Sequence, residues 1–148
     1  MEMASEPLVM NDPHNLPRFL EAQAPVYDQV LAELADGRKQ SHWIWFIFPQ
    51  LAGLGHSAMA RRFAIASLDE AAAYLAHPVL GARLRECSRL VLDLEERSVH
   101  DIFGSPDDLK FRSSMTLFDL ADPAEPVFRQ CLLKYFKGQG DPQTLALL

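Results

Sequence analysis

The stretch SHWIWFIF, residues 41–48, decides which class of fold the chain can adopt. Its aromatic and β-branched residues favour strands. A strand with apolar side chains on both faces needs neighbouring strands, and no other segment has a convincing strand pattern. Because an isolated strand leaves its backbone groups unsatisfied, we expect residues 41–48 to form a short buried helix, capped by Ser41 and ended by Pro49.

The segments on either side of this stretch have the spacing of amphipathic helices. Apolar side chains recur three and four residues apart over residues 16–36, with a break at Pro25 that predicts a kink or two helices, the second with Pro25 in its first turn, and an end at Gly37. A helix near 125–137 ends at Gly138. The chain is therefore predicted to be all-α, a single compact multihelical domain of six to eight short helices over residues 16–148, after a flexible tail at 1–15. Further helix starts are predicted at Ser57, Ser67, Pro78, Ser98, Ser105 and Asp141.

Composition limits the possible partners. The 148 residues carry a net charge of -6, which argues against nucleic acid because phosphate binding needs excess Lys and Arg. No apolar run approaches the ~20 residues of a membrane span, and the N-terminus lacks a signal-peptide core, so a cytoplasmic protein without membrane contact is expected. Cys87 and Cys131 fall in helical patterns typical of buried, reduced thiols. No Cys or His pair has the spacing of metal ligands, so neither a metal nor a cofactor is predicted. A protein partner is left open.

The loop after the aromatic stretch is the first candidate site. Gln50 leads into Gly53 and Gly55, whose lack of a side chain allows close approach of a ligand, and Ser57 opens the next helix. Free amides at such a helix start can hold a phosphate. The same residues are also compatible with an ordinary loop and helix cap.

The aromatic stretch itself has two interpretations. Trp43 and Trp45 can be core residues, or their rings can stack on a planar ligand while each indole N–H finds a partner. His42 is either a structural histidine or an acid–base group, since an imidazole can both donate and accept a proton. Lys39 and Ser41 lie at the entry to the stretch and could contact the same ligand.

The third candidate is SPDDLKFRSSMTLF, residues 105–118. Helical spacing places Asp107, Lys110 and Ser114 on one face. Asp108 is either an ion-pair partner of Arg112, four residues on, or an acid–base group. The small serines beside large apolar residues suggest close packing, with Lys110 directed into a polar cleft.

These motifs together resemble a known family. EAQ at 21–23, SHWIWFIFPQLAGLGHS at 41–57, YLAHPVLGARL at 74–84, IFGSPDDLKFRSSMTLF at 102–118 and DPQTLALL at 141–148 closely resemble the domain-of-unknown-function family 1810. The resemblance runs from about Leu16 to the C-terminus, and it implies a compact all-helical fold without an established activity. FRQCLLKYFKGQGDPQTLALL, residues 128–148, is also similar to the closing helices of an all-helical superfamily linked to NAD and ADP-ribose. The motif order of that superfamily differs, so none of its catalytic residues is carried across.

Two functions follow from these features, and the sequence leaves open whether the protein is an enzyme. The first is binding, or N-glycosidic hydrolysis, of a small phosphorylated nucleotide or ADP-ribose-like ligand. The second is a protein-interaction module without chemistry, in which the aromatic stretch is core. For the first, the predicted catalytic residues are His42, Asp108 and Lys110, and the predicted ligand-binding residues are Lys39, Ser41, Trp43, Trp45, Gln50, Gly53, Gly55, Ser57 and Ser114.

Overall fold

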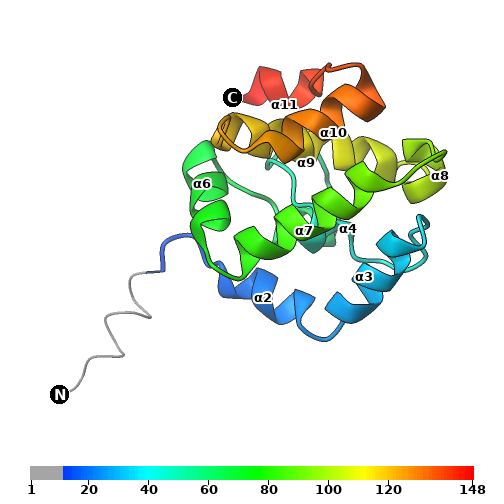
Figure 1. Cartoon of the computed structure of the whole chain (residues 1–148). Coiled ribbons are helices and arrows are strands. Elements are labelled where there is room, and N and C mark those ends of the chain that lie inside the picture. The colour runs from blue at the N-terminus through cyan, green and yellow to red at the C-terminus, as the bar shows by residue number, and fades with distance from the viewer. Residues whose placement is uncertain (1–11) are drawn as a thin grey trace.

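The computed structural model describes residues 12–148, and this part of the chain is all-α (Figure 1). The predicted fold class is confirmed, although the ten helices of the described part exceed the six to eight expected. Most of the predicted tail, residues 1–11, lies outside the described residues. The helices are α2 (Pro17–Gln23), α3 (Tyr27–Ala35), α4 (Ile44–Ile47), α5 (Ala58–Arg62), α6 (Leu68–Ala76), α7 (Leu80–Asp93), α8 (Val99–Phe103), α9 (Asp107–Ala121), α10 (Pro126–Phe136) and α11 (Pro142–Leu147).

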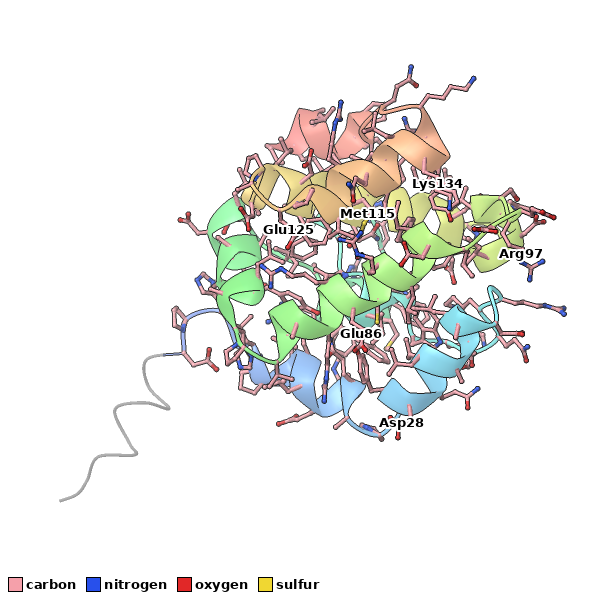
Figure 2. All side chains as sticks on the ribbon, viewed as in Figure 1. Asp28, Glu86, Arg97, Met115, Glu125 and Lys134 are labelled. Atoms are coloured by element: carbon pink, nitrogen blue, oxygen red, sulfur yellow. The ribbon has the colours of Figure 1, made fainter. Side chains whose placement is uncertain are left out.

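The aromatic stretch lies at the centre of one hydrophobic core. Helix α4 packs against α2 and α9, and Figure 1 shows α7 passing in front of it. Figure 2 shows side chains filling the interior between the helices. Phe48 is fully buried and packs edge-on against Phe103 and Phe111, with ring centroids 5.8 and 5.0 Å apart. Edge-to-face pairs of this kind add to the free energy of burial because the positive ring edge meets the negative ring face. The segment that follows α4 is thereby fixed across α9.

The helix within residues 41–48 is confirmed but shorter than expected. It spans Ile44–Ile47, and Trp43 is its N-cap without a side-chain cap. The predicted cap by Ser41 is wrong, because the Ser41 hydroxyl donates to the carboxylate of Glu33 on α3 instead. The Glu33 carboxylate, on another helix, thus takes the place of a local backbone N–H as the partner of the Ser41 hydroxyl.

Most helix ends follow their local signals. The side chains of Ser57, Ser67 and Ser98 each accept a hydrogen bond from the backbone of the following first turn, as predicted. Asp141 caps α11 in the same way. Gly37, at a φ of 75°, ends α3.

Three predicted starts are corrected by the structure. Pro78 does not open a helix, because α7 begins at Leu80 with Val79 as its N-cap. Ser105 is not a cap, because α9 begins at Asp107 with Pro106 in the N-cap position and no side-chain cap. Pro25 lies between α2 and α3 and precedes the N-cap of α3, Val26, so it is outside the first turn. In each case the helix begins after the proline and not at it.

The two thiols belong to the core. Cys87 and Cys131 are buried and unoxidised, and burial raises the pKa of each thiol to about 12. Within residues 12–148, no helix has the length and apolar character that a membrane crossing requires. The same part of the chain contains no group of three His, Cys, Asp or Glu side chains that could hold a metal ion.

Candidate functional site

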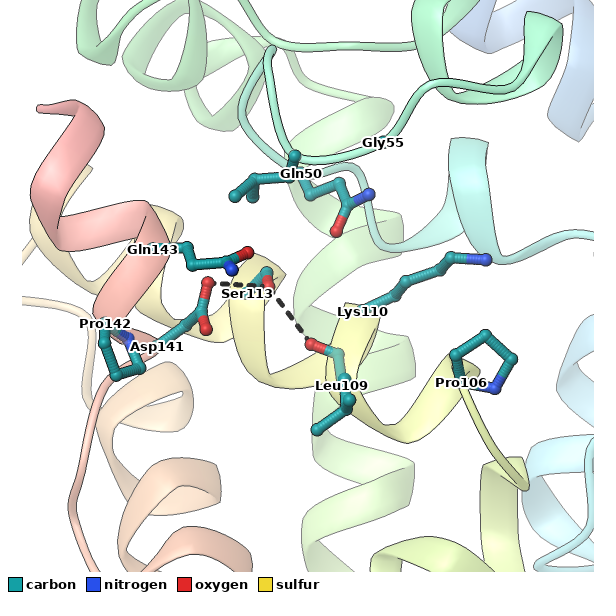
Figure 3. A pocket seen from close by; sticks show the side chains of 10 residues that line it. Gln50, Gly55, Pro106, Leu109, Lys110, Ser113, Asp141, Pro142 and Gln143 are labelled. Atoms are coloured by element: carbon teal, nitrogen blue, oxygen red, sulfur yellow. Dashed lines mark hydrogen bonds between the residues drawn. The ribbon is translucent and has the colours of Figure 1, made fainter.

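A groove of about 490 Å³ opens between α9, the loop after α4 and the start of α11 (Figure 3). This volume is within the range of small-molecule sites. The loop needs a glycine at position 55, because a Cβ there would lie 2.6 Å from the Cβ of Ala60. The lining residues are Gln50, Leu54 and Gly55 from the loop, Pro106, Leu109, Lys110 and Ser113 from α9 and the residue before it, and Asp141, Pro142 and Gln143 from the start of α11.

Hydrogen bonds hold the start of α11 against α9. The backbone N–H of Asp141 donates to Oγ1 of Thr116 at 2.9 Å, and the Ser113 hydroxyl donates to Oδ2 of Asp141 at 3.0 Å. The guanidinium of Arg112 donates to the carbonyls of Gln139 and Gly140. The groove wall formed by residues 141–143 is therefore anchored to the same helix that carries Lys110.

One end of the groove is positively charged. Lys110 Nζ lies 3.3 Å from Oδ1 of Asp107, and Lys39 Nζ lies 2.8 Å from Oδ2 of the same carboxylate. Lys39 is buried, also donates to the Ser41 carbonyl and lies over the Trp43 ring. Two cations thus share one carboxylate, which leaves a net positive charge at this end. Of the two, Lys110 is the one that reaches the groove.

Gln50 directs its side-chain amide into the groove. The residue is only 9% exposed, and within residues 12–148 its side-chain amide has no hydrogen-bond partner. Figure 3 shows the amide extended over α9 toward the side chain of Lys110. The amide is open to solvent in the groove, since the buried side-chain atoms that lack a hydrogen-bond partner in residues 12–148 are the Oγ atoms of Ser88 and Ser114. The groove therefore contains an amide that can exchange water for a ligand.

Asp141 and Gln143 form the opposite end of the groove (Figure 3). Oδ2 of Asp141 accepts from Ser113 and from both the N–H and the hydroxyl of Thr144. Oδ1 of Asp141 has no partner among the described residues. A carboxylate oxygen and an amide thus stand opposite the cationic end.

A second hollow of about 370 Å³ adjoins the groove. It shares Leu54 and Gln143 with the groove and is otherwise lined by Gly53, His56, Ala146 and Leu147. Its walls combine the aliphatic side chains of Leu54, Ala146 and Leu147 with the polar side chains of His56 and Gln143, which suits a ring that carries polar groups. The two hollows together can hold a ligand with a charged part and an apolar part.

A different polar cluster, centred on Glu33, lies at the other end of the aromatic stretch. The Glu33 carboxylate is 4% exposed and accepts hydrogen bonds from Gln29, from the backbone of Gln40, from the backbone and hydroxyl of Ser41 and from the Trp43 indole. Burial alone would raise the pKa of Glu33. The hydrogen bonds from Ser41, Gln40 and Gln29 outweigh burial and lower the pKa from 4.5 to about 2. Both carboxylate oxygens of Glu33 therefore have hydrogen-bond partners within the protein.

The structure brings some of the predicted site residues together and separates others. Gln50, Gly55 and Lys110 line the groove, and Gly53 lines the adjoining hollow. Lys39 lies behind Lys110, and the half-buried ring of Trp45 lies beneath the Lys110 ammonium, 5.4 Å from Nζ to the ring centroid. The residues outside the groove are Trp43 in the core, Ser41 at Glu33, exposed His42, Asp108 facing His100, Ser57 capping α5 and fully buried Ser114.

Sequence reasoning missed the residues of the third wall. Asp141 and Pro142 were interpreted only as a helix start, and Gln143 and Ser113 were not singled out as site residues. One carboxylate oxygen of Asp141 caps α11, and the other has no hydrogen-bond partner within residues 12–148. A capping pattern in the sequence gives no sign of this second oxygen.

Comparison with known proteins agrees with the fold. A family model described as "Protein of unknown function (DUF1810)" matches residues 13–148. The chain is similar to the conserved hypothetical protein Rv1873 from Mycobacterium tuberculosis, known from a crystal structure, with 55% sequence identity and a TM-score of 0.91. That match covers 93% of this chain and 98% of the other. No curated protein matches the chain.

Proposed function

We propose that this protein, which belongs to the family described as protein of unknown function DUF1810, binds a small phosphorylated ligand in the groove between Lys110 and Asp141. The family description assigns no activity, so the proposal rests on the chemistry of the groove. The observation that carries it is the side-chain amide of Gln50, a residue only 9% exposed, which is directed into the groove and has no hydrogen-bond partner in residues 12–148. A bound ligand would satisfy that amide.

The phosphate group would lie between the Lys110 ammonium and the Gln50 amide. Lys110 offers a point charge with three donors, and the amide N–H₂ of Gln50 offers two more. Lys110 can turn toward the ligand at low cost, because Lys39 remains paired with Asp107 at 2.8 Å. The cationic end is thus able to accept an anion without leaving a carboxylate unpaired.

The apolar part of the ligand would occupy the adjoining hollow. Trp45 lines neither hollow, and its ring is covered by Lys110, so the aliphatic walls around Leu54 and Leu147 are the surface that an incoming ring reaches. A nucleotide or an ADP-ribose-like molecule has the required two parts, one charged and one planar.

Hydrolysis of an N-glycosidic bond is not part of the proposal. It requires an acid or base within hydrogen-bond reach of the bond. His42 is exposed and outside the groove, and the Asp108 carboxylate faces Nδ1 of His100 at 3.5 Å. Binding is therefore the function that the geometry supports best.

A protein-interaction surface is the second candidate, favoured by the leucines near the C-terminus. Leu145, Leu147 and Leu148 are 49, 54 and 45% exposed, and Leu68 is 37% exposed. Clustered apolar side chains of this kind are common at protein interfaces. This function would not involve Lys110 or Gln50.

A thermal-shift screen with nucleotides, NAD, ADP-ribose and sugar phosphates tests the ligand proposal. A ligand present at 100 times its Kd stabilises by about 2.7 kcal/mol, a rise in Tm of several degrees. Lys110→Met keeps the aliphatic stem and should abolish the shift. Arg89→Met removes an exposed cation on α7, outside the groove, and should retain it. If no phosphorylated compound raises Tm, the ligand proposal is wrong and the interaction surface is favoured.

A further inference from the structure

The end of the groove opposite Lys110 has a chemistry of its own, which further defines the ligand. Asp141 presents Oδ1 as an acceptor without a partner in the described residues, since its three hydrogen bonds all go to Oδ2. Gln143, two residues on, presents an amide that can donate and accept. Figure 3 places both side chains at one end of the groove and Lys110 at the other.

A second phosphate would not suit this end. A carboxylate repels an anion, and it cannot donate a hydrogen bond at neutral pH. An ammonium group would satisfy Asp141, but it offers no acceptor to the N–H₂ of Gln143. A hydroxyl group both donates and accepts, so it can pair with the carboxylate and the amide together.

We infer that Asp141 and Gln143 bind sugar hydroxyls, so that the groove selects phosphorylated ribosides that carry a free 2′,3′-diol. This inference rests on the proposed function, because it assumes that the phosphate occupies the Lys110 end. The sugar then lies over Ser113, between the two ends. Its base enters the adjoining hollow, whose wall shares Leu54 and Gln143 with the groove.

The position of Asp141 makes it a specificity residue that is held in place independently of the ligand. Three hydrogen bonds to Oδ2 fix the carboxylate plane, so Oδ1 has a defined orientation before binding. A preorganised acceptor favours a ligand with the matching donor, because the carboxylate does not have to be ordered when the ligand binds. Discrimination should therefore exceed what a mobile surface carboxylate could give.

The test compares AMP with 2′,3′-dideoxy-AMP, which keeps the base and the phosphate and lacks both hydroxyls. Affinities for the full chain are measured by calorimetry. We expect the dideoxy compound to bind about 10- to 100-fold more weakly than AMP, the loss expected for hydrogen bonds to a charged acceptor. Equal affinities would overturn the inference.

The variant Asp141→Asn tests whether Asp141 is the residue that discriminates AMP from dideoxy-AMP. Asparagine is a good N-cap and keeps an oxygen for Thr144, but it replaces Oδ1 with a donor. The variant should keep its Tm without ligand, bind AMP about 10-fold more weakly and bind dideoxy-AMP as before. Asp69→Asn, an exposed carboxylate in the first turn of α6, is the matched control and should change neither affinity. Retained discrimination in Asp141→Asn would overturn the assignment.

The outcomes separate this inference from the function on which it rests. If AMP and dideoxy-AMP bind equally and both are lost in Lys110→Met, phosphate binding stands and the diol preference is wrong. If AMP, ribose 5-phosphate and ADP-ribose all fail to bind, the proposed function and the inference are both wrong.

Discussion

Glu33 and Gln50 are both buried polar side chains at the ends of the aromatic stretch, and they differ in how their hydrogen bonds are met. Glu33 receives donors from four residues, and both of its oxygens are occupied. Gln50 is almost as buried and has no partner in the described residues. Folding normally pairs the polar groups that it buries. The polar cluster around Glu33 therefore stabilises the fold, whereas the Gln50 amide is available to a ligand.

The largest effect is expected from Glu33→Gln. The amide nitrogen would replace an oxygen that now accepts two hydrogen bonds, so donors would face donors in the core. We expect the free energy of unfolding to fall by about 3 kcal/mol, measured by urea denaturation. Glu21→Gln alters an exposed carboxylate on α2 and should cost less than about 0.5 kcal/mol. Similar losses of unfolding free energy in the two variants would show that the Glu33 hydrogen bonds do not stabilise the fold.

The same residue predicts a pH dependence of stability. The folded-state pKa of Glu33, about 2, lies below its ordinary value of 4.5, so the unfolded chain binds its proton first. The stabilisation is complete above about pH 5 and is lost as pH falls toward 2, with a maximum of about 3 kcal/mol. Unfolding free energies at pH 7 and pH 3 should therefore differ more in the native sequence than in Glu33→Gln. Parallel pH profiles would show that Glu33 is not the cause.

A smaller loss of stability is expected from Asp107→Asn. Asp107 pairs with Lys39, near the Glu33 cluster, and with Lys110, in the groove. The substitution leaves the Lys39 ammonium, whose side chain is 7% exposed, without its carboxylate. We expect unfolding to require about 2 kcal/mol less, below the loss in a fully buried pair because Asp107 is partly solvated. Asp108→Asn, at the next position, can still accept from the backbone N–H of Leu109 and should be nearly neutral. Calorimetry should give a lower Tm for Asp107→Asn than for Asp108→Asn, and equal Tm values would contradict the prediction.

The smallest effect on stability is expected from Gln50→Met. Methionine has a similar length and volume, and the amide that it replaces forms no hydrogen bond within residues 12–148. Stability should change by less than about 0.5 kcal/mol, while the thermal shift produced by a phosphorylated ligand should shrink. A loss comparable to that of Glu33→Gln would show that the Gln50 amide is already paired in the folded protein.

Local signals in the sequence were sufficient to predict the fold class and most helix ends. Ser67, Ser98 and Asp141 cap the helices that directly follow them, so a window of four residues contains the whole interaction. Ser41 failed as a cap because its acceptor, Glu33, lies eight residues earlier on another helix. A glutamate beside the buried Val30 and Leu34 was a sign of that role, but its partners depend on how residues 40–43 fold back.

The candidate site was only partly predictable for the same reason. Gln50, Gly55 and Lys110 were singled out from unusual local composition, and the structure places them in one groove. Asp141 and Gln143 come from the far end of the chain. Their position follows from the contacts of residues 139–141 with Arg112, Ser113 and Thr116, which no local pattern encodes.

The different surroundings of Trp43 and Trp45 give the protein two optical probes of its own. Trp43 is 1% exposed, and its indole is bonded to Glu33, so its emission should be blue-shifted and insensitive to the groove. Trp45 is half-buried beneath the Lys110 ammonium, a nearby charge that moves if Lys110 turns toward a ligand. A single emission spectrum then contains both an internal reference and a reporter of occupancy, and replacing either tryptophan with phenylalanine isolates the other signal.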